Sequence, residues 1–380
     1  MRDDTATTPL TGTAGGPVPH GMEAIRIPEV SMPFPAHEPN PALPRAEAAL
    51  DAWLDASGLC QSPASRRSLK RTRMPLVTAL CFPDAAPEVL DMLIEWATWS
   101  FLVDDEFDDG PDGAEAVRCA AALATLVPVL DGAQPTDTAS AQAFARTLER
   151  LTNGRSAAWS RMLRHDIGGY LWSFYAGLID QLAHRIPTVT AYRRQRAVTI
   201  AAYTWLDLVE ASASIDLPET VRRLSSFRDL RDAASEYVGL CNDMWSLERD
   251  KRAGGFHNVV LLVQYHEQLT LQEAVDEVND MLTDCAHRML DAERDLTAQL
   301  DAAHITGQAR ADALTCVEGY CKFVRGVFDY YYSVDRYTIR EPDQAGEAAP
   351  VHQLFQTGNA VSGEVPPSRQ SAPSAKVEPR

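Results

Sequence analysis

A long apolar and aromatic run that ends in a cluster of acids constrains this chain more than any other stretch. The run covers residues 92–103, and its apolar spacing predicts a buried helix. Asp104 and Asp108 are four residues apart, so their carboxylates share one face of that helix, and Asp105 lies about 100° around the helix from Asp104. The Gly-Pro pair at 110–111 then predicts the end of the helix.

Acids at this position are electrostatically unfavourable unless another group offsets them. The C-terminal end of a helix disfavours each anion by about 0.3–1 kcal/mol, and like charges four residues apart add a similar small penalty. A hard cation is the natural offset. Mg²⁺ typically takes one or two carboxylates and completes its shell with water and phosphate oxygens. A solvated acidic turn is the alternative explanation for such a run.

The overall charge narrows the set of partners. The 380 residues carry a formal net charge of −18, so we expect neither nucleic acid nor an anionic membrane surface, which both favour excess Lys and Arg. An anionic small substrate stays compatible with this charge if metal ions and a few arginines invert it locally. No apolar run reaches the roughly eighteen residues of a membrane span, and no signal peptide pattern opens the chain. Seven scattered cysteines without a CxxC pair predict reduced thiols in a cytoplasmic protein.

Helical patterns dominate the chain, and no strand pattern stands out. Residues 1–26 predict a disordered arm and residues 341–380 a disordered tail, because both are polar and rich in Pro. One all-α domain over residues 27–340 is the economical fold. Within it, the prolines of residues 27–44 predict an extended segment laid over the domain, which we expect to act as a lid. The expected helices cover residues 46–57, 65–82, 87–109, 113–130, 139–151, 157–184, 189–211, 220–250, 258–264, 270–304 and 308–334.

A second set of oxygen-bearing side chains lies on a later helix. Asn242, Ser246 and Asp250 recur every four residues, so an amide, a hydroxyl and a carboxylate line one face. Glu248 lies about 240° around the helix from Asn242 and points elsewhere. A single Asn or Ser in an apolar helix more simply faces solvent or bonds the preceding turn. Three oxygen donors in register, in a chain that also holds an acidic cluster, instead predict a metal site.

The two sets resemble the metal-binding motifs of bacterial class I terpene synthases. Residues 104–108 match the aspartate-rich DDxxD motif, and residues 242–250 resemble the NDxxSxxxE triad. The resemblance spans nearly the whole helical domain and implies a single-domain α-helical barrel or bundle. It also implies that the motifs face each other and bind three Mg²⁺ ions, with Mn²⁺ as the alternative, which hold the diphosphate of a linear isoprenoid. The implied metal ligands are Asp104, Asp105, Asp108, Asn242, Ser246 and Asp250.

A segment upstream of the triad resembles the family's diphosphate sensor. Residues 192–201 fit its pattern and make Arg196 the sensing arginine. Thr199 and Ile200 then correspond to the linker and effector positions at a break in that helix. The glycine that closes the family segment is Ala201 here, which leaves the geometry of the break open.

Three further positions resemble substrate-binding residues. Arg336 and Tyr337 resemble the family's RY pair, whose side chains hydrogen-bond the diphosphate, and Arg249 stands where a diphosphate-contacting Lys is usual. Arginine keeps the charge and adds a planar donor fork. Phe101 lies one turn before the acids on nearly the same face, and we expect it to line the substrate pocket.

Two other departures from the family pattern concern the shape of the site. The last triad residue is Asp250 rather than Glu, one methylene shorter, so the metal geometry can shift while the charge is kept. Tyr330 stands six residues before Arg336, where Trp is common, which changes the packing of the pocket floor.

The resemblance implies a carbon–oxygen lyase. It would ionise a linear isoprenyl diphosphate, farnesyl diphosphate first, and cyclise the carbocation to a sesquiterpene hydrocarbon or alcohol with release of diphosphate. Geranylgeranyl diphosphate is the alternative substrate, and a homodimer is compatible with the family. A chain-elongating prenyltransferase carries two DDxxD motifs, whereas the second motif here is an Asn/Ser/Asp triad. A helical scaffold without chemistry would need neither the sensor nor the RY pair.

Overall fold

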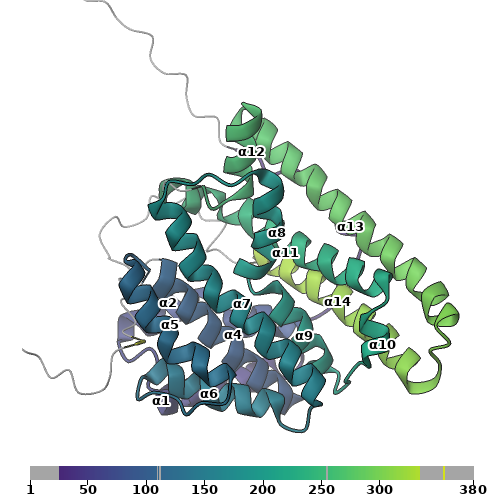
Figure 1. Cartoon of the computed structure of the whole chain (residues 1–380), viewed down its shortest axis with the longest axis horizontal. Helices are drawn as coiled ribbons and strands as arrows, with labels where there is room; N and C mark the ends of the chain where they lie inside the picture. Colours follow the sequence, from purple (N-terminus) through teal and green to yellow (C-terminus); the bar gives the residue numbers. More distant parts are fainter. Residues whose placement is uncertain (1–24, 109, 111–112, 254–255, 334–353, 356–380) are drawn as a thin grey trace, which may run out of the picture.

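Every element of regular structure in the described part of the chain is an α-helix, which confirms the predicted all-α class. The computed structural model describes residues 25–108, 110, 113–253, 256–333 and 354–355. The helices pack around one another in a single bundle, with α13 along one edge (Figure 1). They are α1 Leu43–Ser57, α2 Pro63–Thr72, α3 Met74–Cys81, α4 Pro87–Asp108, α5 Ala116–Leu130, α6 Ala139–Thr152, α7 Ala157–Leu182, α8 Val189–Thr199, α9 Ala202–Ser212, α10 Glu219–Arg222, α11 Ser225–Ala253, α12 Val259–Glu267, α13 Leu271–Ala302 and α14 Gly307–Ser333.

The helix that carries the acidic cluster is buried along most of its length. α4 packs against α1, α3, α6 and α9, and most of its side chains from Leu90 to Phe107 are buried. The indole Nε1 of Trp99 donates to the backbone carbonyl of Ser140 on α6 at 3.1 Å, which fixes the rotation of α4. Because the apolar face continues to the last turn, the acids leave the core only at the end of the helix.

A short helix at the centre of the bundle begins with an unusual backbone conformation. α9 contacts α4, α7, α8, α11 and α14, and the break that separates it from α8 falls at Ile200 and Ala201. Ala201 has φ 55° and ψ 22°, in the left-handed region that costs a non-glycine residue about 1–2 kcal/mol. The continuous helix expected over residues 189–211 is therefore interrupted, at the place that the sensor segment implies.

Two other expected helices are also divided. The single helix expected over residues 65–82 is two helices, α2 and α3, with Arg73 between them at φ 51°. Pro75 causes this break, because proline has no N–H for the helical ladder and disfavours the helical conformation of the residue before it. The helix expected over residues 220–250 likewise consists of the short α10 and the long α11.

The proline-rich segment lies extended along the outside of the bundle, as its composition predicts. Side chains of the helices hold its backbone carbonyls. Arg325 of α14 donates to the Phe34 carbonyl at 2.9 Å, and Tyr237 of α11 donates to the Ser31 carbonyl at 3.0 Å. The segment therefore follows α14 toward the end of the bundle at which α14 terminates.

The described pair Leu354–Phe355 returns to the domain. Leu354 is buried, and its carbonyl accepts the Ser140 N–H of α6 at 3.4 Å. The Phe355 ring lies 5.5 Å from that of Phe107, beside the acidic cluster. At these two residues the tail packs on the bundle, in contrast to the detached tail expected from its composition; the rest of residues 341–380 lies outside the described residues.

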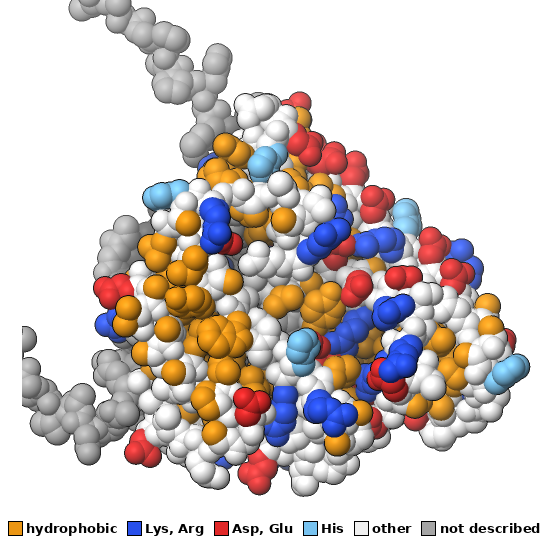
Figure 2. Space-filling view, viewed as in Figure 1, with side chains coloured by type: hydrophobic (Ala, Val, Ile, Leu, Met, Phe, Trp, Pro, Cys, Tyr) orange, Lys and Arg blue, Asp and Glu red, His pale blue; other side chains and the backbone are white. Residues whose placement is uncertain are grey.

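The acidic balance of the chain is largely a surface property. Figure 2 shows acidic side chains along the edge formed by α13. All nine acidic residues of this helix are exposed to solvent, namely Glu273, Asp276, Glu277, Asp280, Asp284, Asp291, Glu293, Asp295 and Asp301. None of the helices in the described ranges has the length and apolar character that crossing a membrane requires.

Candidate active site

The second half of α11 presents the predicted triad. Asn242, Ser246 and Asp250 lie on successive turns of the helix, and the Ser246 hydroxyl donates to Asp250 Oδ2 at 2.6 Å. This bond requires both side chains to point to the same side of α11, as the four-residue spacing predicts.

The predicted sensor lies directly on this triad. Arg196 of α8 donates from Nη2 to Asn242 Oδ1 at 2.6 Å and from Nη1 to Thr199 Oγ1 at 3.1 Å. Its aliphatic part packs over Gly239 of α11, where an added Cβ would come within 2.9 Å of Arg196 Cγ. Two residues 46 positions apart in the sequence are thus in direct contact, and the break after Thr199 leaves the sensor at the end of α8.

A carboxylate that the sequence analysis did not single out holds the sensor. Asp243 is fully buried, and its Oδ1 accepts from Arg196 Nε at 2.8 Å while its Oδ2 accepts the Val259 N–H at 2.8 Å. Burial raises the pKa of Asp243, and the Arg196 charge opposes that rise. Burial also disfavours the charge of Arg196, but Asp243, together with Tyr192 and Asp104, offsets this effect and raises the pKa of Arg196. A buried acid in an apolar helix needs a cationic partner, which was the available signal in the sequence.

The orientation of the triad amide is set from α14. Asn242 Nδ2 donates to the Tyr331 hydroxyl at 2.6 Å, which directs Oδ1 toward Arg196. The Tyr331 ring stacks on Trp245 with centroids 5.8 Å apart. Tyr331 was not among the predicted site residues, because nothing in the sequence places a position 89 residues away beside Asn242.

The shorter acid at the end of the triad is held by several donors. Asp250 Oδ2 accepts from Ser246 Oγ and, at 2.9 Å, from Asn258 Nδ2, while Oδ1 accepts from Arg249 Nε at 3.2 Å. Arg249 is half exposed, so its guanidinium can reach both Asp250 and an anion outside the helix.

The acids of α4 lie within electrostatic reach of these groups. Asp104 and Asp105 are half-buried and Asp108 is exposed. Burial, and then the charges of Asp108 and Asp105, raise the pKa of Asp104 well above its usual range, whereas Arg249 and Arg196 lower it. Asp104 therefore lies on the side of α4 that faces the sensor and the triad.

The donor set of the two motifs fits hard divalent cations. Carboxylate, amide and hydroxyl oxygens are the ligands that Mg²⁺ and Mn²⁺ prefer. Within the described ranges, no three His, Cys, Asp or Glu side chains converge on one point. Mg²⁺ typically takes one or two carboxylates and completes its shell with phosphate and water. The accumulated negative charge around Asp104 is the feature that such ions would neutralise.

The remaining predicted residues fall into two groups. Phe101 is half-buried and packs against the core, and Ile200 is half-buried at the helix break. Tyr330 is buried, and its hydroxyl donates to the Thr72 carbonyl at the end of α2 at 2.6 Å, so it ties α14 to α2. Arg336 and Tyr337 lie outside the described residues, beyond the end of α14 at Ser333.

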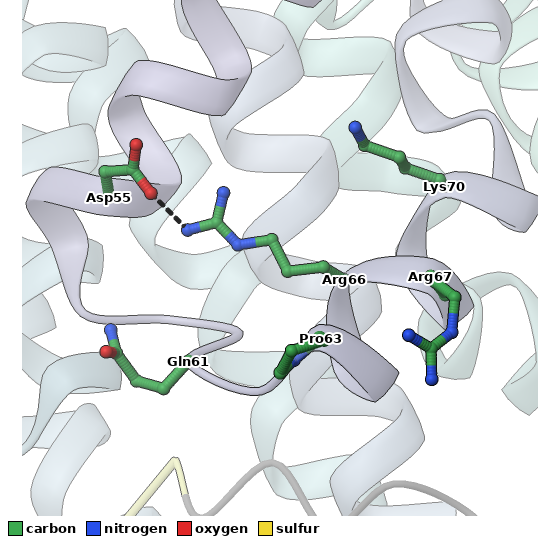
Figure 3. Close-up of a pocket in the computed structure, with 6 residues that line it drawn as sticks. All are labelled: Asp55, Gln61, Pro63, Arg66, Arg67 and Lys70. Atoms are coloured by element: carbon green, nitrogen blue, oxygen red, sulfur yellow. Dashed lines mark hydrogen bonds and ion pairs between the residues drawn. The ribbon is translucent and has the colours of Figure 1, made fainter.

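A hollow between α1 and α2 contains none of the predicted site residues. It encloses about 490 Å³ and is lined by Asp55, Gln61, Pro63, Arg66, Arg67 and Lys70 (Figure 3). Arg66 is paired with Asp55 at 2.6 Å. Arg66 therefore has a structural partner within the hollow.

Comparison with known proteins places the matched region on these same helices. The family model described as "Terpene synthase family 2, C-terminal metal binding" matches residues 95–288, which include both motifs and the sensor. A (2Z,6E)-hedycaryol synthase of Kitasatospora setae is 28% identical over 330 residues, which covers 86% of this chain and 96% of that protein. A (+)-T-muurolol synthase of Roseiflexus castenholzii, described as cyclising (2E,6E)-farnesyl diphosphate, is 29% identical over 60% of this chain and 71% of its own length.

The fold agrees with that of solved relatives. The structure of a hedycaryol synthase in complex with HEPES superposes with a TM-score of 0.74 at 26% identity and covers 82% of this chain and all of that chain.

Proposed function

The chain belongs to the terpene synthase family, and from this premise we propose that it cyclises farnesyl diphosphate to a sesquiterpene hydrocarbon or alcohol and releases diphosphate. One observation carries the assignment to this site. Arg196 donates to Asn242 at 2.6 Å. The charge of Asp104 raises the pKa of Arg196, and the charge of Arg196 in turn lowers the pKa of Asp104. We infer that this permanent cation and the oxygen donors of both motifs line one site, which is the arrangement that an anionic leaving group requires.

The bound metals, which we propose to be three Mg²⁺ ions, would supply electrostatic stabilisation of the departing diphosphate. Asp104, Asp108, Asn242, Ser246 and Asp250 would hold them, with Asp105 in support.

The arginines act on the leaving group itself. Because Asp243 keeps Arg196 charged and immobile, the guanidinium needs little reorganisation when negative charge develops on the diphosphate. We propose the same role for Arg249, Arg336 and Tyr337. Thr199 accepts from Arg196 and connects the sensor to Ile200, which stands at the break where the carbocation would begin its path.

The apolar lining protects the carbocation. A bundle closed by buried apolar side chains excludes water, and an aromatic face such as that of Phe101 stabilises a cation by about 0.5–2 kcal/mol.

The substrate assignment rests on the relatives. The muurolol synthase is named for cyclising farnesyl diphosphate, and no described feature of this chain favours a longer substrate. Geranylgeranyl diphosphate is the second candidate. We also propose a cytoplasmic enzyme, since the structure shows seven free cysteines and all but Cys321 are buried. A homodimer is part of the same proposal.

Product analysis tests the function. The purified protein is incubated with geranyl, farnesyl or geranylgeranyl diphosphate and Mg²⁺, and the extract is analysed for terpenes. We expect a cyclic product from farnesyl diphosphate. Longer diphosphates formed only with added isopentenyl diphosphate would identify an elongating enzyme instead, and the absence of turnover with all three substrates would favour a scaffold.

The extended segment over residues 27–44 offers a second measurement. We propose that it closes the end of the bundle during turnover, because it follows α14 toward the site. Removing residues 1–44 should then increase alcohols formed by early capture of water. An unchanged product profile contradicts a lid.

A further inference from the structure

The first residue before α12 contacts the triad, although it belongs to none of the predicted motifs. Asn258 is fully buried and caps α12, because its Oδ1 accepts the Val260 N–H at 3.0 Å. Its Nδ2 donates to the Asp243 carbonyl at 2.7 Å and to Asp250 Oδ2 at 2.9 Å. Both polar atoms of this side chain are therefore engaged, and it connects α12 to two residues of α11 that are seven positions, about two turns, apart.

The two carboxylate oxygens of Asp250 have different hydrogen-bond donors. Oδ2 accepts from two buried or partly buried donors, Ser246 Oγ and Asn258 Nδ2. Among the described residues, Oδ1 accepts from Arg249 alone, whose side chain is half exposed. The carboxylate is thus anchored through Oδ2, while Oδ1 contacts a side chain that reaches solvent.

The chemistry of the anchor preserves the charge. An amide N–H orients a carboxylate without neutralising it, whereas a buried Lys or Arg at the same place would compete with a metal ion for it. The anchor also matters more for Asp than for Glu. A shorter acid reaches a metal only from a restricted set of positions, and Asn258 selects one of them.

We propose that Asn258 is a positioning residue that holds Asp250 in the orientation required for metal binding. This inference rests on the proposed function, since it requires a metal site at the triad. Loss of an outer partner of a metal ligand typically weakens metal binding by about 10–100-fold.

The test measures binding without turnover. Mn²⁺ is titrated in the presence of inorganic diphosphate and followed by electron paramagnetic resonance and by calorimetry. Asn258→Ser keeps an N-cap oxygen for α12 and removes the amide donor. We expect its affinity for Mn²⁺ with diphosphate to fall by about 10-fold relative to the wild type. Unchanged affinity would overturn the inference.

Two controls separate the possible causes. Thr138→Ala removes the N-cap of α6, which lies on another helix, and should leave Mn²⁺ binding unchanged, so a decrease there would attribute the effect to lost capping. Asp250→Ala asks whether the triad binds metal at all. If Asp250→Ala binds Mn²⁺ with normal affinity, the triad is not a metal site and the proposed function is contradicted. If Asp250→Ala loses affinity and Asn258→Ser keeps it, only the positioning role of Asn258 is contradicted.

A double substitution gives the sharpest result. Asp250→Glu lengthens the acid by one methylene and frees it from the position that Asn258 selects. The Asn258→Ser substitution should therefore weaken Mn²⁺ binding less in the Asp250→Glu background than it does in the wild-type background. Equal weakening in both backgrounds contradicts the proposal. If Asn258→Ser does not fold, Asn258→Asp keeps the cap and the size, and its carboxylate repels Asp250.

Discussion

Two largely buried arginines, Arg231 of α11 itself and Arg196 of α8, bind at opposite halves of α11 but have different electrostatic surroundings. Near the start of the helix, Arg231 donates to Asp207 of α9 at 2.5 Å and to Asp166 of α7 at 2.6 Å. Arg196 contacts α11 at Asp243, twelve residues and about 18 Å further along the helix than Arg231. Arg231 joins α7, α9 and α11, and Arg196 joins α8 to α11. Both do so through charged hydrogen bonds that solvent barely reaches.

The balance of charge distinguishes them. Arg231 donates to two carboxylates and to the Tyr203 carbonyl, so its charge is paired within the protein and it joins α7, α9 and α11. Arg196 makes one bond to the Asp243 carboxylate and the others to neutral groups, and the charges of Asp108 and Asp105 act together on the nearby Asp104. Because perturbed titratable groups gather at functional sites, we assign the proposed site to this end of the bundle.

The largest expected difference between the two ends is in turnover. Asn242→Ala removes a proposed metal ligand and an Arg196 acceptor, and we expect turnover to fall by about 10²–10³-fold or more. Helicity by circular dichroism should be unchanged, because alanine favours the helix and the substitution removes no apolar core side chain. Turnover within a few-fold of the wild type would contradict the assignment of the triad.

The next effect should appear in stability at the other end. Arg231→Gln leaves Asp207 buried without its cation, and we expect the free energy of unfolding in urea to fall by about 3–5 kcal/mol. The turnover per folded molecule should stay near that of the wild type. Arg196→Gln is the matched variant, and it should lose turnover as well as stability. A similar loss of turnover in both variants would remove the distinction drawn here.

The pH dependence of stability sharpens the same comparison. Burial raises the pKa of Asp207 well above its usual range, and Arg231 opposes the rise; Asp166 and Tyr320 also face this carboxyl. The folded state then holds the proton at pH values where the unfolded state has released it. Stability is therefore lost as the pH rises from the unfolded pKa of about 3.9 through the folded pKa.

Thermal melts between pH 5 and pH 8 check this sign. Asp207→Asn cannot ionise, so its Tm should improve relative to that of the wild type as the pH increases. A constant difference in Tm across the range would show that Asp207 keeps the same charge throughout.

The smallest expected effect lies between the two ends, at the break between α8 and α9. Ala201→Gly relieves the left-handed strain but adds freedom to the unfolded chain, so we expect a net gain of about 0.5–1 kcal/mol in urea unfolding. Ala202→Gly, one residue later in regular helix, should instead destabilise the protein. A loss of stability in both variants would mean that the break does not strain Ala201.

Local patterns predicted much of this arrangement. The end of α4 at Asp108 follows from its Gly-Pro neighbour, and the shared face of Asn242, Ser246 and Asp250 follows from the helical repeat. Divided helices were harder to predict. The break at Arg73 has a local cause in Pro75, whereas an alanine gives no local signal for the left-handed conformation at Ala201.

The sequence by itself determined the helical class, the two sets of proposed metal ligands and the proposed sensor, because these depend on residue type and on spacing within one helix. Only the tertiary structure decided what holds them. Asp243 on Arg196, Tyr331 on Asn242 and Asn258 on Asp250 are contacts between helices. Such contacts depend on how the helices pack and rotate against one another, and that is set by the whole core rather than by any one segment.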